Sequence, residues 1–138
     1  MTYELTALAW STVLLIALIL TSANANVMVM GMGWGIGNRD EPANVTGWAA
    51  RARRTYLNHL ENLLSFGLLV IIAHLAGVST GITVLGAQLF LFGRLAYAGI
   101  YIAGISAMGV RTLAFFVALV GTLMIAYELL TAVPVAAA

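Results

Sequence analysis

The chain has 138 residues, of which 62% are hydrophobic and only 8% are charged. Soluble domains carry about 25% charged residues, so lipid must surround most of a chain this small and this apolar. The formal net charge of +1, with its basic residues clustered, excludes an extended polyanion-binding surface and therefore a nucleic-acid partner. The absence of cysteine excludes disulfide, zinc–thiolate and cysteine-nucleophile chemistry.

Four long apolar stretches predict four transmembrane helices. A bilayer core of about 30 Å requires about 20 apolar residues of helix, and only helices or closed barrels satisfy the backbone in lipid. The stretches lack the alternating pattern of barrel strands, which favours helices. The predicted spans are residues 5–32, 51–77, 82–105 and 110–133. Together they fill most of residues 1–138 and predict one all-α domain, a four-transmembrane-helix bundle.

The first predicted span is expected to be retained and to end in a loop. Residues 22–25 resemble a signal-peptide cleavage site, but Glu4 lies where such a peptide requires basic residues. Glycines alternate through residues 31–37, with the small-residue spacing that favours close helix packing. Residues 38–42 have the composition of a turn. A phosphate-binding loop would need a preceding strand, and the apolar sequence predicts none.

The distribution of arginine predicts the orientation of the chain, which contains no lysine. Four arginines lie between the first span and the opening turns of the second, and Arg111 follows the third span. The connection at residues 78–81 and both ends of the chain carry none. By the positive-inside rule, the first and third connections are expected in the cytoplasm. The termini and the middle connection are expected outside.

The second predicted span opens with the chain's largest group of polar residues. On a helix, Arg54, Asn58 and Glu61 lie on one stripe, and Arg51 precedes Arg54 by nearly one turn. His59 lies about 100° around the helix from Asn58. We therefore expect His59 to contact a neighbouring helix or the interface rather than to take part in catalysis.

A second polar stripe lies on the third predicted span, where Arg94, Tyr97 and Tyr101 share one helix face. Ionisable residues at membrane depth usually face the protein interior and pair with one another. Glu61 and Arg94 are therefore the expected ion pair. On these residues alone, a purely structural pair and a ligand site are equally supported.

Cationic groups outnumber carboxylates on this side of the membrane, which shifts the balance toward a ligand. Arg51, Arg53, Arg54, Arg94 and Arg111 accompany the single spanning-helix carboxylate of Glu61. An uncompensated basic pocket suits an anionic ligand. The rival interpretation, expected for one or two of these arginines, is an anchor to lipid phosphates. No spacing of histidines and carboxylates predicts a metal site.

Two motifs in these spans resemble signatures of the MAPEG family, the membrane-associated proteins in eicosanoid and glutathione metabolism. The second predicted span resembles the family's second helix in the pattern Arg51-x-Arg53-Arg54-x-x-x-Asn58-x-x-Glu61-Asn62. The third predicted span and the start of the fourth resemble the corresponding helices of the family in the pattern Phe92-Gly93-Arg94-x-x-Tyr97-x-x-x-Tyr101-x-x-Gly104, followed by Arg111-Thr112. The resemblance extends over nearly the whole chain.

The resemblance implies a homotrimer that binds glutathione as a co-substrate between adjacent protomers, near the cytoplasmic face. The implied catalytic residues are Arg111 and Thr112. A nearby guanidinium lowers the pKa of a thiol, and the thiolate is the nucleophile. A lipophilic co-substrate would enter from the bilayer. The residues implied to bind glutathione are Arg51, Arg54, Asn58, Glu61, Arg94, Tyr97 and Tyr101.

The chain departs from eicosanoid-forming members of the family, and it looks more like the bacterial branch. Leu57 stands where some of those members have a basic residue, and Phe115 where a tyrosine can occur. The expected function is a transferase or peroxidase that uses glutathione, or another small thiol, on lipophilic electrophiles in a bacterial inner membrane. The alternative is a non-catalytic trimeric membrane protein that binds lipid or supports other membrane proteins.

Overall fold

The computed structural model describes residues 1–106 and 109–132, and it contains no strand within them. Its helices, in chain order, are α1 (Tyr3–Met30), α2 (Met32–Ile36), α3 (Gly47–Leu75), α4 (Gly81–Ala103) and α5 (Val110–Ala132). The helices α1, α3, α4 and α5 are each long and apolar enough to cross a membrane. The prediction of an all-α integral membrane protein with four spans is confirmed. The predicted end of the last span, residue 133, lies outside the described residues.

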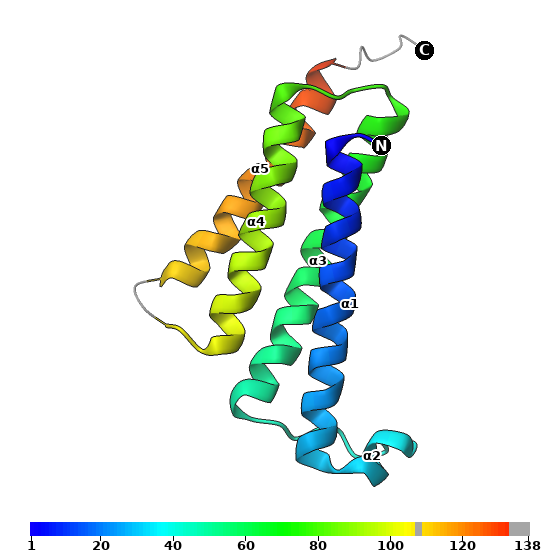
Figure 1. Cartoon of the computed structure of the whole chain (residues 1–138), viewed down its shortest axis with the longest axis vertical. Helices are drawn as coiled ribbons and strands as arrows, with labels where there is room; N and C mark the ends of the chain where they lie inside the picture. The colour runs from blue at the N-terminus through cyan, green and yellow to red at the C-terminus, as the bar shows by residue number, and fades with distance from the viewer. Residues whose placement is uncertain (107–108, 133–138) are drawn as a thin grey trace.

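The four long helices run alternately up and down the bundle (Figure 1). The pair α4 and α5 makes the most extensive contact, followed by the pair α1 and α3, and α4 also contacts both helices of the second pair. The start of α3, the end of α4 and the start of α5 lie together, with Arg51, Arg54 and Arg111, and we call this the arginine end. The opposite end holds the starts of α1 and α4 and the ends of α3 and α5.

Small residues allow α4 and α5 to pack at backbone contact. A Cβ atom added to Gly86 would come within 2.6 Å of the carbonyl oxygen of Gly121. Close approach of this kind drives helix association in lipid, where hydrophobic burial contributes little. Phe66 of α3 and Phe90 of α4 stack with ring centroids 3.8 Å apart, which joins α3 to the same core.

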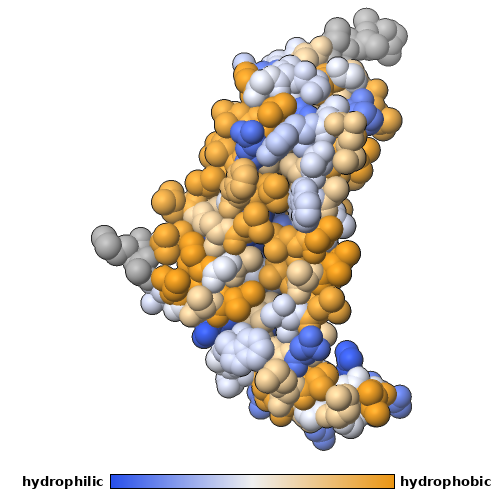
Figure 2. Space-filling model, viewed as in Figure 1, coloured by the Kyte–Doolittle hydropathy of each residue, from blue (hydrophilic) through white to orange (hydrophobic). Residues whose placement is uncertain are grey.

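The outer surface of the bundle is apolar, as contact with lipid requires. Trp10 and Phe92 are each 61% exposed, and many leucines and isoleucines of all four long helices are also exposed. Hydrophobic residues cover most of the face seen in Figure 2, while hydrophilic ones lie mainly toward its two ends, with the deepest blue around the end where α2 lies. An apolar exterior over four spans is the arrangement expected when the bilayer is the solvent.

Local sequence sets the boundaries of α4, which joins the two ends of the bundle. Thr80 and Thr83 form a reciprocal capping box that satisfies free amide groups at its start. Gly104 ends the helix in the left-handed conformation, with φ of 75°. The predicted span of residues 82–105 therefore matches the observed helix to within two residues.

The end of the first predicted span differs from expectation. Gly31 has φ of 89°, so α1 stops at Met30 and the short helix α2 follows in a new direction. Of the described helices, α2 contacts α1 alone, so the glycine-rich stretch does not pack between spans. The predicted turn after it is present, and Trp34 Nε1 donates a hydrogen bond to the carbonyl oxygen of Glu41 across it at 2.8 Å.

Candidate functional site

Hydrogen bonds tie the first turns of α3 to the last turn of α4 at the arginine end. Arg51 Nε donates to the carbonyl oxygen of Ile102 at 3.3 Å, and Arg54 Nε donates to the Tyr101 hydroxyl at 2.9 Å. Both arginines reach α4 because they lie about one turn apart on α3. Two residues of the predicted site, Arg54 and Tyr101, are therefore in direct contact.

The first turn of α5 adds a third arginine to the same group. The guanidinium carbon of Arg111 lies 4.6 Å from the centre of the Tyr101 ring, and that of Arg54 lies 5.9 Å from it. Both distances are within cation–π range, so one aromatic ring holds two cations. Tyr101 in turn packs edge-on against Tyr97, with ring centroids 5.6 Å apart.

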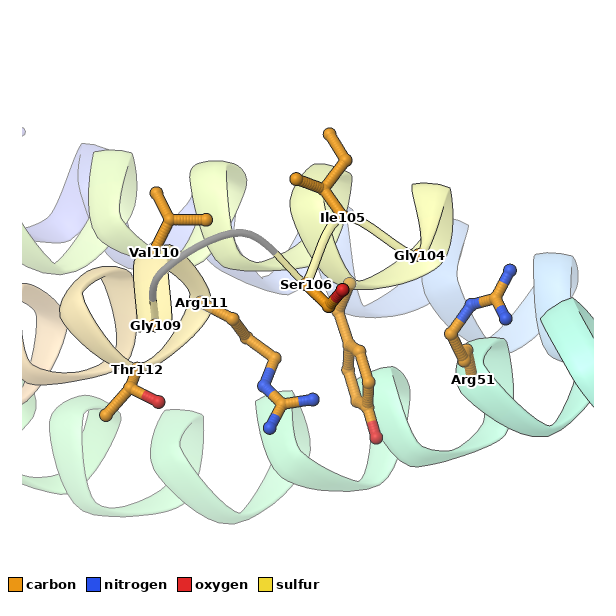
Figure 3. A pocket seen from close by; sticks show the side chains of 9 residues that line it. Arg51, Gly104, Ile105, Ser106, Gly109, Val110, Arg111 and Thr112 are labelled. Carbon is orange, nitrogen blue, oxygen red and sulfur yellow. The ribbon is translucent and has the colours of Figure 1, made fainter.

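These contacts surround a cavity of about 190 Å³, here called the Arg111 cavity. Figure 3 shows Arg111 and Thr112 on the α5 side and Arg51 reaching from α3 toward the end of α4. Gly104 keeps room for Arg51, because a Cβ atom there would lie 3.0 Å from the guanidinium carbon. The residues that line the cavity are Arg51, Tyr101, Gly104, Ile105, Ser106, Gly109, Val110, Arg111 and Thr112.

A second polar group is buried inside the bundle around Arg94, which is only 1% exposed. Its Nη1 donates to Asn58 Oδ1 at 3.0 Å and its Nε to His59 Nδ1 at 3.1 Å, while its guanidinium carbon lies 4.6 Å from the Tyr97 ring centre. Arginine has no acceptor, so His59 Nδ1 must accept, and the proton on Nε2 is donated to the carbonyl oxygen of Ser11 at 2.9 Å. One network thus joins α1, α3 and α4.

The prediction that Glu61 and Arg94 form an ion pair is wrong for the described part of the chain. Glu61 is exposed, and Arg94 bonds to Asn58 and His59 instead. Helix geometry explains the difference: Arg94 lies between the directions of Asn58 and His59, about 110° around α3 from Glu61. Arg54 and Glu61 share the exposed side of α3, facing away from this network.

The predicted site residues therefore separate into two groups and one outlier. The Arg111 cavity brings together Arg51, Tyr101, Arg111 and Thr112, and Arg54 joins it through Tyr101. Asn58, Arg94 and Tyr97 belong to the buried network, and Glu61 belongs to neither. Sequence reasoning missed the central part of His59 and Ser11 in that network. The available signal was that His59 points about 100° around α3 from Asn58, away from Arg54 and Glu61.

The described residues hold no group of three or more histidine, cysteine, aspartate or glutamate side chains that could bind a metal ion. The chemistry of the arginine end is instead that of a cationic cavity with three hydroxyl-bearing residues, Tyr101, Ser106 and Thr112. Such a lining suits an anion that also accepts hydrogen bonds.

The fold and the site define a class: a small four-span α-helical membrane protein with an arginine-lined cavity at one end of its bundle. The model of the MAPEG family matches residues 7–131, from the first turns of α1 to the last turn of α5. The chain therefore belongs to the MAPEG family, as its second- and third-span motifs predicted. Comparisons with curated proteins and with solved structures gave no match.

Proposed function

We propose that this protein is a membrane-bound transferase or peroxidase that uses glutathione, or another small thiol, against lipophilic electrophiles or hydroperoxides. The MAPEG family includes enzymes of this kind and also non-catalytic members. The observation that carries the proposal is the Arg111 cavity, where Arg51, Arg111 and Thr112 line one space.

The chemistry follows from what each side chain offers to an anionic thiol. The Arg111 guanidinium, held over Tyr101, stabilises a thiolate and so lowers the pKa of the bound thiol. Thr112 adds a hydroxyl donor at the neighbouring position. Arg51 and Arg54 supply positive charge for the carboxylates of glutathione, which arginine binds through two parallel hydrogen bonds. The thiol proton is released to water, the thiolate sulfur then bonds to the electrophilic atom, and the leaving group departs with its bonding electrons.

The site is proposed to be completed by a second copy of the chain in a homotrimer. The Arg111 cavity measures about 190 Å³, below the range of about 300–1,000 Å³ usual for small-molecule sites. Arg54 and Glu61 are exposed on one side of α3, where a neighbouring protomer would cover them. Glutathione would lie between the protomers, within reach of the Arg111 cavity and of Arg54 and Glu61.

The co-substrate is proposed to come from the lipid. An apolar groove of about 430 Å³ lies between α1 and α4, lined by Trp10, Val13, Leu14, Ala17, Leu91 and Leu95. A lipophilic molecule dissolved in the bilayer reaches such a surface without crossing water. Because the arginines gather at one end of the bundle, we infer that this end faces the cytoplasm, in a bacterial inner membrane.

A second candidate is a non-catalytic trimer that binds lipid or supports other membrane proteins. One observation favours it: Arg94 is bonded to Asn58 and His59 inside its own protomer, a contact that fastens helices together without a ligand. In this case Arg51 and Arg54 would bind lipid phosphates at the membrane surface.

Ultraviolet absorbance of the thiolate separates the two functions. Glutathione at millimolar concentration would be added to the purified protein in detergent, and to the Arg111→Ala and Arg39→Ala variants. Arg39 is the matched control, since it lies in the connection after α2 and bonds to Gly35. A thiolate signal in the native protein and in Arg39→Ala, lost in Arg111→Ala, supports the enzyme. The absence of glutathione binding to the native protein contradicts it.

The mass of the complex in detergent tests the proposed trimer. The mass of a monomer or of a dimer would exclude it.

A further inference from the structure

The opposite end of the bundle contains a buried carboxylate with one free oxygen. Glu4, in the first turn of α1, is only 4% exposed. Its Oε1 accepts hydrogen bonds from the hydroxyls of Ser79, at 3.0 Å, and Thr83. Its Oε2 is buried and has no hydrogen-bond partner among the described residues. These hydroxyls hold the carboxyl group against the connection from α3 to α4 and the first turn of α4, while Oε2 keeps no partner among the described residues.

Glu4 forms part of the wall of a cavity of about 200 Å³, here called the Glu4 pocket. Thr2, His74 and Ser79 supply its other polar side chains, and the rest of the lining includes the apolar Val70 and Ala73. The pocket is separate from the Arg111 cavity and shares no lining residue with it.

No arginine of the chain is available to Oε2, and the imidazole of His74, which lines the pocket, makes no hydrogen bond to Glu4 among the described residues. All six arginines lie at or between residues 39 and 111, and none lies on α1, in the last twenty residues of α3 or in the first half of α4. Met1 is 91% exposed, and its amino group makes no ion pair with Glu4 in the described structure. A buried carboxylate oxygen without a donor is costly, so a donor from outside the chain is favoured there.

We propose that the Glu4 pocket binds a protonated primary amine. The ammonium group donates to Glu4 Oε2, and its remaining protons face the hydroxyls of Thr2 and Ser79 and the imidazole of His74. A short alkyl chain on the amine lies against Val70 and Ala73. A divalent metal is a poorer fit, because the described residues supply one carboxylate here and no cluster of ligands. The amine can belong to a free molecule or to an aminoalkyl lipid headgroup.

Glu128 provides the matched control at the same end of the bundle. Its Oε2 accepts a hydrogen bond from the Thr80 hydroxyl at 3.1 Å, and it does not line the Glu4 pocket. Glu4 and Glu128 are therefore both hydrogen-bonded at the start of α4, but of the two only Glu4 lines the Glu4 pocket and has a buried oxygen without a hydrogen-bond partner among the described residues. Removing the charge of either residue changes the net charge equally.

The test is a ligand-observed NMR titration of ethanolammonium chloride into the whole protein in a non-ionic detergent. Saturable binding is expected, weakened at least about tenfold by Glu4→Gln, since one charge-assisted hydrogen bond is lost. Glu128→Gln should bind as the native protein does. Choline, which lacks N–H donors, should bind at least about tenfold more weakly than ethanolammonium. Equal binding to the native protein and Glu4→Gln, or no binding at all, overturns the proposal and leaves only a buried water.

His74→Lys keeps the proposal testable if Glu4→Gln fails to fold. His74 is exposed, so a lysine is tolerated there, and its own ammonium group would occupy the pocket. This variant should lose ethanolammonium binding, and retained binding would contradict the proposal.

Native mass spectrometry from nanodiscs of mixed phosphatidylethanolamine and phosphatidylcholine identifies the source of the amine. Selective retention of phosphatidylethanolamine that depends on Glu4 indicates a lipid, and binding of ethanolammonium alone indicates a free amine.

Discussion

The buried contact between Arg94 and His59 allows a direct test of what holds α1, α3 and α4 together. Replacing His59 by leucine keeps an apolar side chain of similar size and removes both hydrogen bonds of the imidazole. Arg94 Nε loses its acceptor, and the carbonyl oxygen of Ser11 loses its donor. Arg94 Nη2 is already buried without a partner among the described residues, so the guanidinium would retain a single hydrogen bond, to Asn58.

The size of the effect follows from these two lost bonds. A buried polar group without a partner costs about 1–3 kcal/mol in soluble proteins, which applies to Arg94 Nε, whereas the Ser11 carbonyl oxygen still accepts within α1. Hydrogen bonds in membrane proteins contribute less, about 0.6 kcal/mol on average, because helices unfolded in lipid still find partners. Arg94 remains a buried charge, so the expected loss lies above twice that average, at about 2 kcal/mol.

The assay is reversible unfolding in mixed micelles by titration with sodium dodecyl sulfate, followed by circular dichroism. His74→Leu, an exposed histidine on the same helix, is the control and should cost less than about 0.5 kcal/mol. Adding Arg94→Met to His59→Leu should recover part of the lost stability, because the buried charge is then removed. If His59→Leu and His74→Leu unfold at the same detergent fraction, the reasoning is refuted.

Three further substitutions, and one control at Gly99, test the packing and the cavity. Gly121→Ala would place a Cβ atom 2.8 Å from the Phe90 amide nitrogen and should cost about 1–3 kcal/mol in the same unfolding assay. Gly99→Ala, with no atom within 4 Å of its Cβ, should be neutral or stabilising, and equal losses would contradict the close packing. Gly104→Ala should weaken glutathione binding in equilibrium dialysis, because its φ of 75° disfavours alanine and its Cβ would displace Arg51. Tyr101→Phe removes the acceptor of an α3 arginine and should weaken the same binding by about fivefold to tenfold, while unchanged binding would exclude that contact from the site.

The four spans were predictable because length and apolarity alone determine which segments cross a bilayer. The observed long helices begin and end within about four residues of the predicted ones. The break at Gly31 was not predicted, since small residues spaced four apart are compatible with a continuous packed helix as well as with a left-handed stop. That choice depends on tertiary contacts, which the sequence spacing does not report.

The sequence predicted most of the polar residues that come together, but not which of them contact one another. Opposite charge suggested that Glu61 pairs with Arg94, whereas the rotation of α3 turns Asn58 and His59 toward Arg94 instead. The position of each residue on its own helix is readable from its number, but the face that one helix turns toward another is not. For the same reason His59 was assigned correctly to a neighbouring helix without its partner Ser11 being identified.

The buried state of Glu4 was not foreseen at all. In the sequence it was informative only as an acidic residue near the start of the first span. Its hydroxyl partners, Ser79 and Thr83, lie at the start of α4 and just before it. Contacts between residues so far apart in the chain follow from the packing of α1 against α4, which local patterns do not encode.

The rate of thiol conjugation tests the central claim most directly. The protein in detergent would be given saturating glutathione and a lipophilic aromatic halide, and conjugate formation would be followed for the native chain, Arg111→Ala and Arg39→Ala. Loss of one group that stabilises the reacting anion costs about 10²–10³ in kcat, so Arg111→Ala should fall by that factor while Arg39→Ala keeps the native rate. Equal rates for the native protein and Arg111→Ala, or no turnover above the uncatalysed reaction, would contradict the account.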